Sequence, residues 1–350
     1  MFGFGKPKGL VGLDIGSSSV KAVELKKKGS TYELLNLGLE PLSQDTIVDG
    51  AVMDALSVSS AIEKIFTENK IKTKNVATSV SGHSVIVKKI TVAAVTEEEV
   101  ASAIPYEAQQ YIPFDMADVN LSYQILGPPA AGPGFDVMLV AVKREKILNH
   151  TTVLSQAGKL PVVVDIDAFA VQNAFELNFE PPADLMAALL NIGASIMNIN
   201  IVRGGVPLFT RDVSVGGNQY TDTLQKELDL SFEDAEKLKQ GRELSNISPE
   251  AKIPHIRSVS EILLLEIQKT FDFFRQTTST ENIQHIYVAG GTARIEGLVD
   301  LLKGEFNIPV EILNPFRKIE FDPRKFDTTY VNEIAPRMSV AVGLALRSFD

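Results

Sequence analysis

Leu13-Asp-Ile-Gly-Ser-Ser18 and, 177 residues later, Leu190-Asn-Ile-Gly-Ala-Ser195 carry the same pattern. In each stretch a short apolar run reaches Asp or Asn, a turn of small residues follows, and a second apolar run begins. This arrangement predicts a strand, a tight turn and a second strand. Such turns expose backbone N–H groups that can surround phosphate oxygens, and glycine allows the backbone to approach a ligand closely. Because the offset is close to half of the 350 residues, we expect two related lobes that each contribute one phosphate-binding turn.

The first copy carries the polar groups that a nucleotide with Mg²⁺ requires. Asp14 ends the first strand, and a hydrated Mg²⁺ needs only one or two carboxylates besides the phosphates. We therefore expect Asp14 to hold the metal through water. The turn offers backbone and hydroxyl donors from Gly16, Ser17, Ser18 and Ser19. Lys21 follows on the outgoing strand, close enough to direct its ammonium group at a phosphate.

The second copy differs from the first at its carboxylate position, because Asn191 aligns with Asp14. It keeps the small residues that a phosphate turn requires. These are Gly193, Ala194 and Ser195. Another small pair, Gly216 and Gly217, leads into a helix predicted over 218–227.

Two later segments add to the predicted nucleotide site. The first is a strand followed by a diglycine turn and a helix start, which offers a flat surface for a base or sugar beside a helix N-terminus. Its residues include Gly290, Gly291, Thr292 and Arg294. The second is a charged helix in which Glu236 and Lys239 are three residues apart and share one face. A solvated surface helix is the simpler interpretation of that pair.

Composition excludes several classes of function. The net charge is −10, which argues against a nucleic-acid-binding protein because phosphate neutralisation needs clustered Lys and Arg. The absence of cysteine excludes disulfides, thiolate zinc sites and a cysteine nucleophile. No uninterrupted apolar run is long enough to predict a membrane-spanning helix. Near the N-terminus, Phe2 and Phe4 beside Lys6 and Lys8 could touch a membrane or a partner, although a frayed tail is the simpler interpretation.

The rest of the chain alternates strand and helix patterns, which indicates an α/β fold. We expect further strands over 32–39, 76–80, 85–92, 119–125, 136–142, 162–165, 188–191, 197–202, 207–213, 286–289 and 310–313. We expect helices over 54–69, 96–111, 144–156, 168–179, 218–227, 232–239, 258–277, 297–306 and 340–347. The helix at 96–111 begins with a capping box, in which Thr96 caps the helix and Glu99 reaches back.

These motifs, in this order, resemble the actin–hexokinase–Hsp70 ATPase superfamily over nearly the whole chain. The resemblance implies two lobes with a nucleotide cleft between them and a mixed five-stranded sheet in each. Asp14–Lys21 would be the first phosphate loop, Asn191–Ser195 the second and Gly290–Arg294 the adenosine motif. Glu236 and Lys239 look like its ribose- and adenine-side contacts. The connecting segments at the hinge would be Val163–Asp167 and Pro336–Leu344.

Within the superfamily the chain most resembles PilM, the family of cytoplasmic actin-like proteins of type IV pilus assembly. The residues that carry this are Tyr111-Ile-Pro-Phe114, Asp165-Ile-Asp-Ala168 and Thr210-Arg-Asp-Val-Ser-Val-Gly-Gly-Asn218, together with the first turn. An insertion in the first lobe matches the position of the extra subdomain of PilM and of the division protein FtsA. FtsA-type proteins also end in an amphipathic membrane-targeting helix, which we do not expect after Arg347.

The implied domain layout follows the superfamily. The first-lobe core would comprise 1–92 and 156–187, interrupted by an inserted subdomain at 93–155. The second-lobe core would comprise 188–220 and 283–335, interrupted by a subdomain at 221–282. The last segment, 336–350, would return to the first lobe as a helix.

The PilM resemblance implies an ATP-binding scaffold in twitching motility, peripheral to the inner membrane through its partners. Its expected partner is the N-terminal cytoplasmic tail of PilN, and other platform proteins and pilus motor ATPases are further candidates. The tail would lie extended in a groove between the first lobe and the insertion, along residues from about Val85 to Ile112.

One departure bears on catalysis. Most of the superfamily places Asp where this chain has Asn191. An amide can hydrogen-bond a Mg²⁺ water, but it accepts a proton poorly and adds no charge. General-base assistance contributes about 10²–10⁴-fold, so we expect ATP and Mg²⁺ to bind with slow or absent hydrolysis. Asp165 and Asp167 are the candidates for positioning water, and strand-end and helix-cap roles are their simpler interpretation.

Two other functions remain open at this point. A small-molecule kinase of the sugar or acetate type shares both phosphate loops, and Asp165 or Asp167 would then deprotonate a substrate hydroxyl. An FtsA-like polymerising ATPase shares the insertion. Asn191 weakens the first alternative, and the absence of an expected membrane helix weakens the second.

Overall fold

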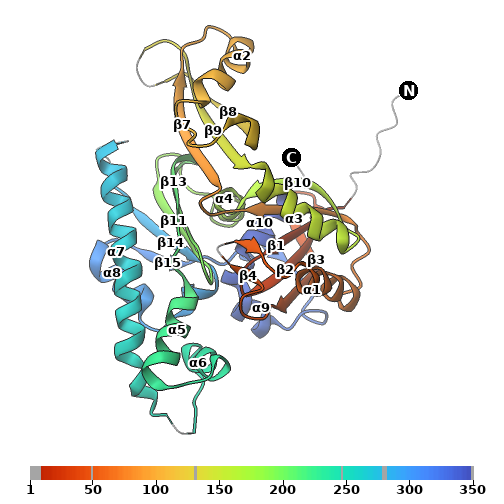
Figure 1. Ribbon diagram of the computed structural model, residues 1–350, viewed down its shortest axis with the longest axis vertical. Coiled ribbons are helices and arrows are strands. Elements are labelled where there is room, and N and C mark those ends of the chain that lie inside the picture. Colours follow the sequence, from red (N-terminus) through yellow and green to blue (C-terminus); the bar gives the residue numbers. More distant parts are fainter. Residues whose placement is uncertain (1–8, 49, 130–131, 246, 278–281, 348–350) are drawn as a thin grey trace.

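The computed structural model describes residues 9–48, 50–129, 132–245, 247–277 and 282–347. Within them the chain forms two lobes side by side, with a smaller three-stranded body above them (Figure 1). The predicted roles of Phe2, Phe4, Lys6 and Lys8 lie outside the described residues. None of the described helices combines the length and the apolar character that crossing a bilayer demands.

The first lobe is built on a six-stranded mixed sheet. Its strands, from edge to edge, are β10 (Leu160–Ile166), β6 (Asn75–Val80), β1 (Val11–Ile15), β2 (Ser19–Lys28), β3 (Thr31–Pro41) and β16 (Ile319–Glu320). The alternate residues Val11, Leu13 and Ile15 pack against α1 (Ala55–Glu68) and α3 (Arg144–Gln156). The sheet has one strand more than predicted, because the two-residue β16 pairs with the edge of β3.

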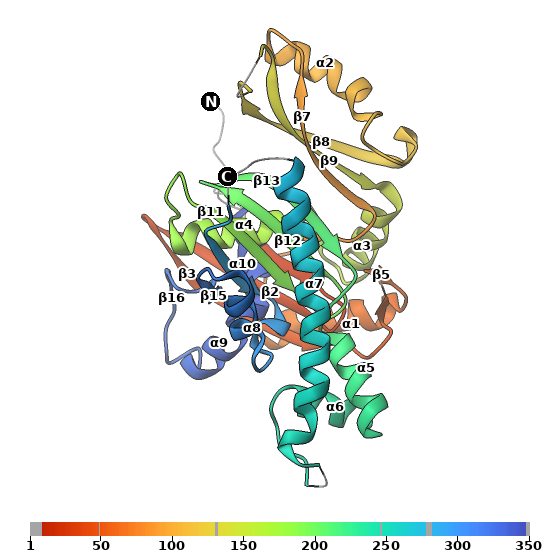
Figure 2. The same cartoon turned by 90° about the vertical axis from the view of Figure 1, so that its left-hand side faces the viewer.

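The second lobe repeats the same strand order. Its sheet runs β13 (Val206–Val213), β12 (Met197–Arg203), β11 (Met186–Ile192), β14 (His285–Ala289) and β15 (Val310–Ile312). One face is covered by α5 (Gly217–Leu228), α6 (Phe232–Lys239), α7 (Ile253–Thr277) and α8 (Leu298–Phe306). Figure 2 shows α7 running along the outside of this lobe. In both lobes three antiparallel strands are followed by two parallel ones.

The repeat extends to the register of the two central hairpins. Asp14 stands opposite Lys21 in the first lobe, and Asn191 stands opposite Asn198 in the second. The turns close in the same way, since the Gly16 amide donates to the Ser19 carbonyl at 3.1 Å and the Gly193 amide to the Ile196 carbonyl at 2.9 Å. The two related lobes predicted from the 177-residue offset are therefore present.

Two helices join the lobes, α4 (Asp167–Phe179) and α10 (Ser339–Leu346). They share one apolar cluster with strands of both sheets, which places them between the lobes. Their close approach requires glycine. A Cβ at Gly12 would lie 2.0 Å from the Ala341 carbonyl oxygen, and one at Gly343 would lie 1.6 Å from that of Ala170. The small residues of the last helix thus let it reach both β1 and α4.

The smaller body consists of β7 (Val85–Val92), β9 (Phe135–Lys143) and β8 (Val119–Gly127), covered by α2 (Glu97–Ala108). The Thr96 hydroxyl accepts from the Glu99 amide at 3.2 Å, as expected of a cap. Because β7 pairs with β9, this sheet begins at Val85, before the predicted boundary at 93. Conversely, α3 packs against α1 in the first-lobe core, although 144–155 was assigned to the insertion.

Several short elements were not predicted. They are β4 (Ile47–Val48), β5 (Ala51–Val52), α9 (Thr328–Ile334) and β16. Two helix ends also differ from the prediction, since α7 starts at Ile253 and α2 stops at Ala108. Two-residue strands and seven-residue helices carry too few periodic positions to be recognised from sequence.

Candidate functional site

The first phosphate turn holds a buried ion pair. Lys21 Nζ lies 2.9 Å from Asp14 Oδ2, and each side chain is 11% exposed. Burial is the main cause that raises the pKa of the Asp14 carboxyl, and Lys21 opposes that rise. A Cβ at Gly16 would lie 2.8 Å from Lys21 Nζ, so glycine leaves room for the ammonium directly beneath the turn. Lys21 therefore lies where predicted, but its charge is engaged by Asp14.

Ser19 adds a polar group that the protein itself does not use. Its side chain is buried, and Oγ has no hydrogen-bond partner in the described part of the chain. A buried hydroxyl without a partner is unfavourable, so a ligand atom at this turn would satisfy it. Ser17 and Ser18 form the tip of the same turn, and the Ser18 carbonyl accepts from the Leu42 amide at 3.0 Å. The first turn therefore fits a phosphate.

The second turn replaces the ion pair with a chain of hydrogen bonds. Asn191 Nδ2 donates to Asn198 Oδ1, and Asn198 Nδ2 donates to Asp212 Oδ1, both at 2.8 Å. Asp212 Oδ2 accepts from the Gly82 amide at 2.6 Å, which links the second lobe to the first. Burial raises the pKa of Asp212 to about 6, against the opposing effects of these two donors. The sequence analysis quoted Asp212 only as part of the stretch Thr210–Asn218 and assigned no site role to it or to Asn198.

The glycine-rich segments gather around this second turn. Gly193 O accepts from the Gly217 amide at 2.9 Å and from the Thr292 hydroxyl at 3.0 Å. Gly290 has φ +88°, and a Cβ there would lie 2.3 Å from the Ile192 carbonyl oxygen. Gly216 is equally restricted, because its Cβ would lie 2.6 Å from the carbonyl oxygens of both Gly193 and Ala194. Three segments far apart in the sequence thus pack together through their backbones, at positions where a side chain would not fit.

The turn is tied to α5 by its remaining residues. The Ala194 carbonyl accepts from the Asn218 amide at 2.8 Å. The Ser195 hydroxyl accepts from Asn218 Nδ2 at 3.2 Å. The N-terminus of α5 therefore lies against the second turn, and its first amides donate to the carbonyls of that turn.

The charged pair on α6 faces the same place. Lys239 Nζ contacts Glu236, donates to the Thr221 hydroxyl at 2.8 Å and lies 3.3 Å from the Gly217 carbonyl oxygen. Burial is the main cause that lowers the pKa of Lys239. The solvated-helix interpretation is therefore wrong for this pair, which is fixed against the start of α5.

Arg294, the last residue of the predicted adenosine motif, forms its hydrogen bond with α9 rather than with the second turn. Arg294 Nη2 donates to the Asn332 carbonyl at 2.6 Å, so this side chain anchors α9. Arg337 takes the nearby position, since a Cβ at Gly291 would lie 3.6 Å from its Nε. Arg337 also contributes to the lowered pKa of Lys239. The sequence analysis placed Arg337 in the connecting segment Pro336–Leu344 but did not identify it as a site residue.

The two candidate water-positioning carboxylates are separated by the structure. Asp165 Oδ2 lies 3.3 Å from Arg347 Nε, and Asp165 Oδ1 accepts from the Ile166 amide. Asp167 begins α4 and accepts from the Ser79 hydroxyl at 2.6 Å. Its charge raises the pKa of both Asp14 and Asp212, so it lies within electrostatic reach of both turns. Of the two, Asp167 is the one near both turns, and it also lines the cavity described below.

Lys146, which the sequence analysis did not identify, lies within electrostatic reach of Asp167 and Asp212. Lys146, on α3, donates to the Gly50 carbonyl in the β4–β5 hairpin. Burial lowers the pKa of Lys146, and the nearby charges of Asp167 and Asp212 oppose that effect. The same hairpin approaches the second turn, because a Cβ at Gly50 would lie 3.6 Å from Ile196 Cδ1.

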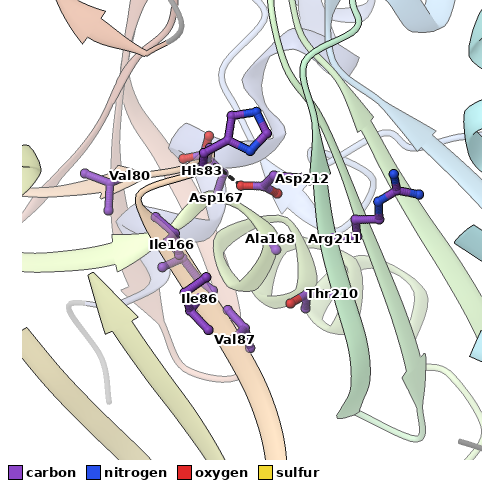
Figure 3. Close-up of a pocket in the computed structure, with 12 residues that line it drawn as sticks. Val80, His83, Ile86, Val87, Ile166, Asp167, Ala168, Thr210, Arg211 and Asp212 are labelled. Carbon is purple, nitrogen blue, oxygen red and sulfur yellow. Dashed lines mark hydrogen bonds between the residues drawn. The ribbon is translucent and has the colours of Figure 1, made fainter. Parts of the chain in front are cut away.

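A cavity of about 230 Å³ lies where the first lobe, the smaller body and the second lobe meet. Figure 3 shows His83, Asp167 and Asp212 at one end and aliphatic side chains along the wall. The aliphatic lining residues are Val80, Val85, Ile86, Val87, Ile166 and Ala168. Two sheet edges border the cavity, β7 of the smaller body and β13 of the second lobe. Of the predicted stretch 85–112, only its first three residues line this cavity.

Comparisons with known proteins agree with this architecture. A family model described as type IV pilus assembly protein PilM matches residues 12–349. A solved PilM–PilN type IV pilus biogenesis complex contains a chain that is 28% identical, with a TM-score of 0.87, and the match covers 97% of this chain and 98% of that one.

More distant structures show the same fold. The ethanolamine utilization protein EutJ from Carboxydothermus hydrogenoformans is 17% identical, with a TM-score of 0.59 and coverage of 99% and 92%. MreB5 of Spiroplasma citri bound to AMPPNP is 14% identical, with a TM-score of 0.52 and coverage of 97% and 95%. The predicted actin-like fold class is therefore confirmed.

Proposed function

The chain belongs to the PilM family of type IV pilus assembly proteins, and we propose that it is an ATP-binding scaffold that captures the N-terminal cytoplasmic tail of PilN. The observation that carries the proposal is the pair of hairpins in one register, each ending in a turn of small residues, with a lined cavity at the junction beyond them. The scaffold would be cytoplasmic and would reach the inner membrane through its partners.

The cleft between the hairpins would bind ATP with Mg²⁺. Asp14 would hold the metal through water, which would release Lys21 to a phosphate oxygen. Ser19 supports this role because its buried hydroxyl has no partner among the described residues. The bound Mg²⁺ would supply the positive charge that offsets the triphosphate. The second phosphate loop, Asn191 with Gly193, Ala194 and Ser195, would face the same phosphates from the opposite lobe.

The nucleoside end would lie against a floor formed by the backbone of these glycine-rich segments. Gly216, Gly217 and Gly290 let that backbone pack directly against the second turn, because a Cβ at these positions would meet a carbonyl oxygen or the Thr292 hydroxyl. Glu236 and Lys239 would contact the ribose and adenine side, and Thr292 would hold the floor to the second turn through Gly193. Arg337 is the further cation at this end.

Slow turnover is the second part of the proposal. Asn191 adds no charge at the metal and accepts a proton poorly. The remaining carboxylates are engaged, because Asp165 pairs with Arg347 and Asp167 accepts from Ser79. This arrangement favours retention of ATP over phosphoryl transfer to a small molecule.

The cavity between β7 and β13 would receive the PilN tail. An extended peptide gains main-chain hydrogen bonds at an exposed sheet edge and specificity from pockets for alternate side chains. Here two edges flank an aliphatic wall, so apolar tail residues would face Val85, Ile86 and Val87. Other platform proteins and pilus motor ATPases would bind elsewhere on the scaffold.

A titration with a labelled peptide copying the PilN tail tests this function, with Mg²⁺ and ATP present. We expect saturable binding to the unaltered protein and at least about tenfold weaker binding to Val87→Asp, because a charge would replace part of the wall. Val206→Asp, at the far end of β13, is the matched control and should bind normally. No binding at high micromolar peptide would overturn the scaffold function.

A further inference from the structure

The hydrogen-bond chain behind the second turn has a direction that one residue determines. Its members are Asn191, Asn198, Asp212 and the Gly82 amide. A carboxylate only accepts hydrogen bonds, a backbone N–H only donates, and a side-chain amide does both. Asp212 therefore requires Asn198 to turn its NH₂ group toward Asp212.

The orientation of Asn198 in turn determines the orientation of Asn191, the next residue in this series of hydrogen bonds. With its NH₂ group toward Asp212, Asn198 offers its oxygen to Asn191, at 2.8 Å from Asn191 Nδ2. Asn191 then uses its NH₂ group inside the protein. Its Oδ1 receives no hydrogen bond from any residue that the structure describes, and the side chain is only partly buried. The oxygen of Asn191 is thus available to a ligand in the cleft.

We propose that Asp212 is a positioning residue that fixes the polarity of the two amides, so that Asn191 presents an oxygen, rather than an NH₂ group, to the hydrated Mg²⁺ of a bound nucleotide. The inference rests on the proposed binding of ATP. It explains how a second loop without a carboxylate accepts hydrogen bonds from metal-bound water. Asn191 Oδ1 occupies the register position at which Asp14 offers its carboxylate in the first lobe.

Two observations support a fixed orientation of Asp212. The Gly82 amide holds Oδ2 at 2.6 Å from the opposite lobe while Asn198 holds Oδ1, so both oxygens are engaged. The chain is also enclosed, since Asn198 is buried and Asp212 lies on the strand that pairs with it. The titratable and charged groups facing Asp212, namely Asp167, His83 and Lys146, form their described hydrogen bonds with other residues, which are Ser79, Ser214 and Gly50.

Asp212→Asn tests the proposal because every hydrogen bond can be kept with the direction reversed. The new amide would accept from Gly82 and donate to Asn198, which would donate to Asn191. Asn191 would then direct its NH₂ group into the cleft. We expect the gain in ATP affinity on adding Mg²⁺ to fall about tenfold, as for loss of a charge-assisted hydrogen bond, while the affinity for ATP in EDTA stays within about twofold.

The double variant Asn198→Asp with Asp212→Asn provides the matched control. Its charge equals that of the unaltered protein, but the acceptor-only group now stands directly opposite Asn191. Asn191 would again donate inward and present its oxygen, so the Mg²⁺-dependent gain should return. Isothermal titration of ATP into each protein, with Mg²⁺ and with EDTA, measures both affinities, and circular dichroism confirms the fold.

The outcomes separate this inference from the proposed function. If the unaltered protein fails to bind ATP at millimolar concentration, both are overturned. If it binds ATP and Asp212→Asn retains the full Mg²⁺-dependent gain, the positioning role alone is overturned. Equal losses with Mg²⁺ and with EDTA, or no recovery in the folded double variant, would show a structural role for Asp212 and would also overturn the inference.

Discussion

Replacing Lys21 with methionine leaves the buried carboxylate of Asp14, in the first phosphate turn, without its partner. The ammonium lies 2.9 Å from Asp14 Oδ2, and the substitution keeps the aliphatic volume while removing the positive charge. Asp14 would remain buried without its partner, and its pKa, already raised by burial, would rise further. Removing one member of a buried pair costs about 3–5 kcal/mol. We expect Lys21→Met to lower the free energy of unfolding by this amount at pH 7.

The pH dependence gives an independent limit on this magnitude. Taking up a proton removes the charge of the buried, unpaired Asp14 carboxylate. At pH 7 this protonation costs about 4 kcal/mol for a group with an ordinary pKa of 3.8. A raised folded-state pKa means that stability is retained at low pH and lost as pH rises. The deficit of Lys21→Met relative to the unaltered protein should therefore shrink as pH falls from 7 to 5, by at most about 1.4 kcal/mol per pH unit.

Urea denaturation followed by far-ultraviolet circular dichroism, at several pH values and without nucleotide, measures the deficit. The matched control is the double variant Asp14→Asn with Lys21→Met, which removes both charges. It should recover most of the stability yet still bind ATP and Mg²⁺ weakly. A deficit that does not change with pH, or a double variant as unstable as the single one, would refute the assignment of the penalty to Asp14.

Three further predictions concern other parts of the cleft. Gly290→Ala should destabilise the protein by at least about 2 kcal/mol in urea and abolish ATP binding, because φ is +88° and the new Cβ would meet the Ile192 carbonyl at 2.3 Å. Asp212 has a pKa of about 6, so its ionisation costs up to about 3 kcal/mol. Stability from this group is complete near pH 4 and is lost as pH rises through 6, and thermal unfolding of Asp212→Asn should lack that slope. Asp167→Asn should alter ATP affinity in calorimetry, whereas Asp165→Asn should leave it unchanged; the reverse order would contradict the placement of the two carboxylates.

The central hairpins could be predicted because their information is local. A carboxylate or amide at the end of a strand, a turn of small residues and a second strand appear as one continuous run of sequence. Repetition of that run at half the chain length predicted two lobes, and the matching registers of Asp14 with Lys21 and Asn191 with Asn198 have that origin. The PilM family assignment, made on such motifs, is confirmed by the family match over residues 12–349.

Contacts between distant segments could not be predicted in the same way. No local pattern assigns a site role to Asp212, Lys146 or Arg337, although Asp212 and Arg337 lie in segments that carried the family resemblance, and only tertiary packing brings the three side chains near the two turns. The ion pair of Asp165 with Arg347 depends on the return of α10 to the first lobe. The same limit applies to Gly82. The hydrogen bond from its backbone amide to Asp212 joins residues that are 130 positions apart in the sequence. Periodicity records the face on which a residue lies, but not the residue that it meets there.

The two central hairpins have the same register but different polar pairs beside their turns. The first lobe has an ion pair, which under the proposed function would supply a carboxylate for a metal and an ammonium for a phosphate. The second lobe uses two amides in the same register, which supply hydrogen bonds without net charge.

The central claim is that these hairpins hold one Mg²⁺–ATP and hydrolyse it slowly. The most direct measurement incubates the purified protein with radiolabelled ATP and Mg²⁺, separates the complex from unbound nucleotide, and follows the bound label over time. We predict one nucleotide per chain, recovered as ATP with turnover well below about one per second. Failure to retain any nucleotide, or conversion at several per second by protein free of contaminating ATPase, would contradict the account.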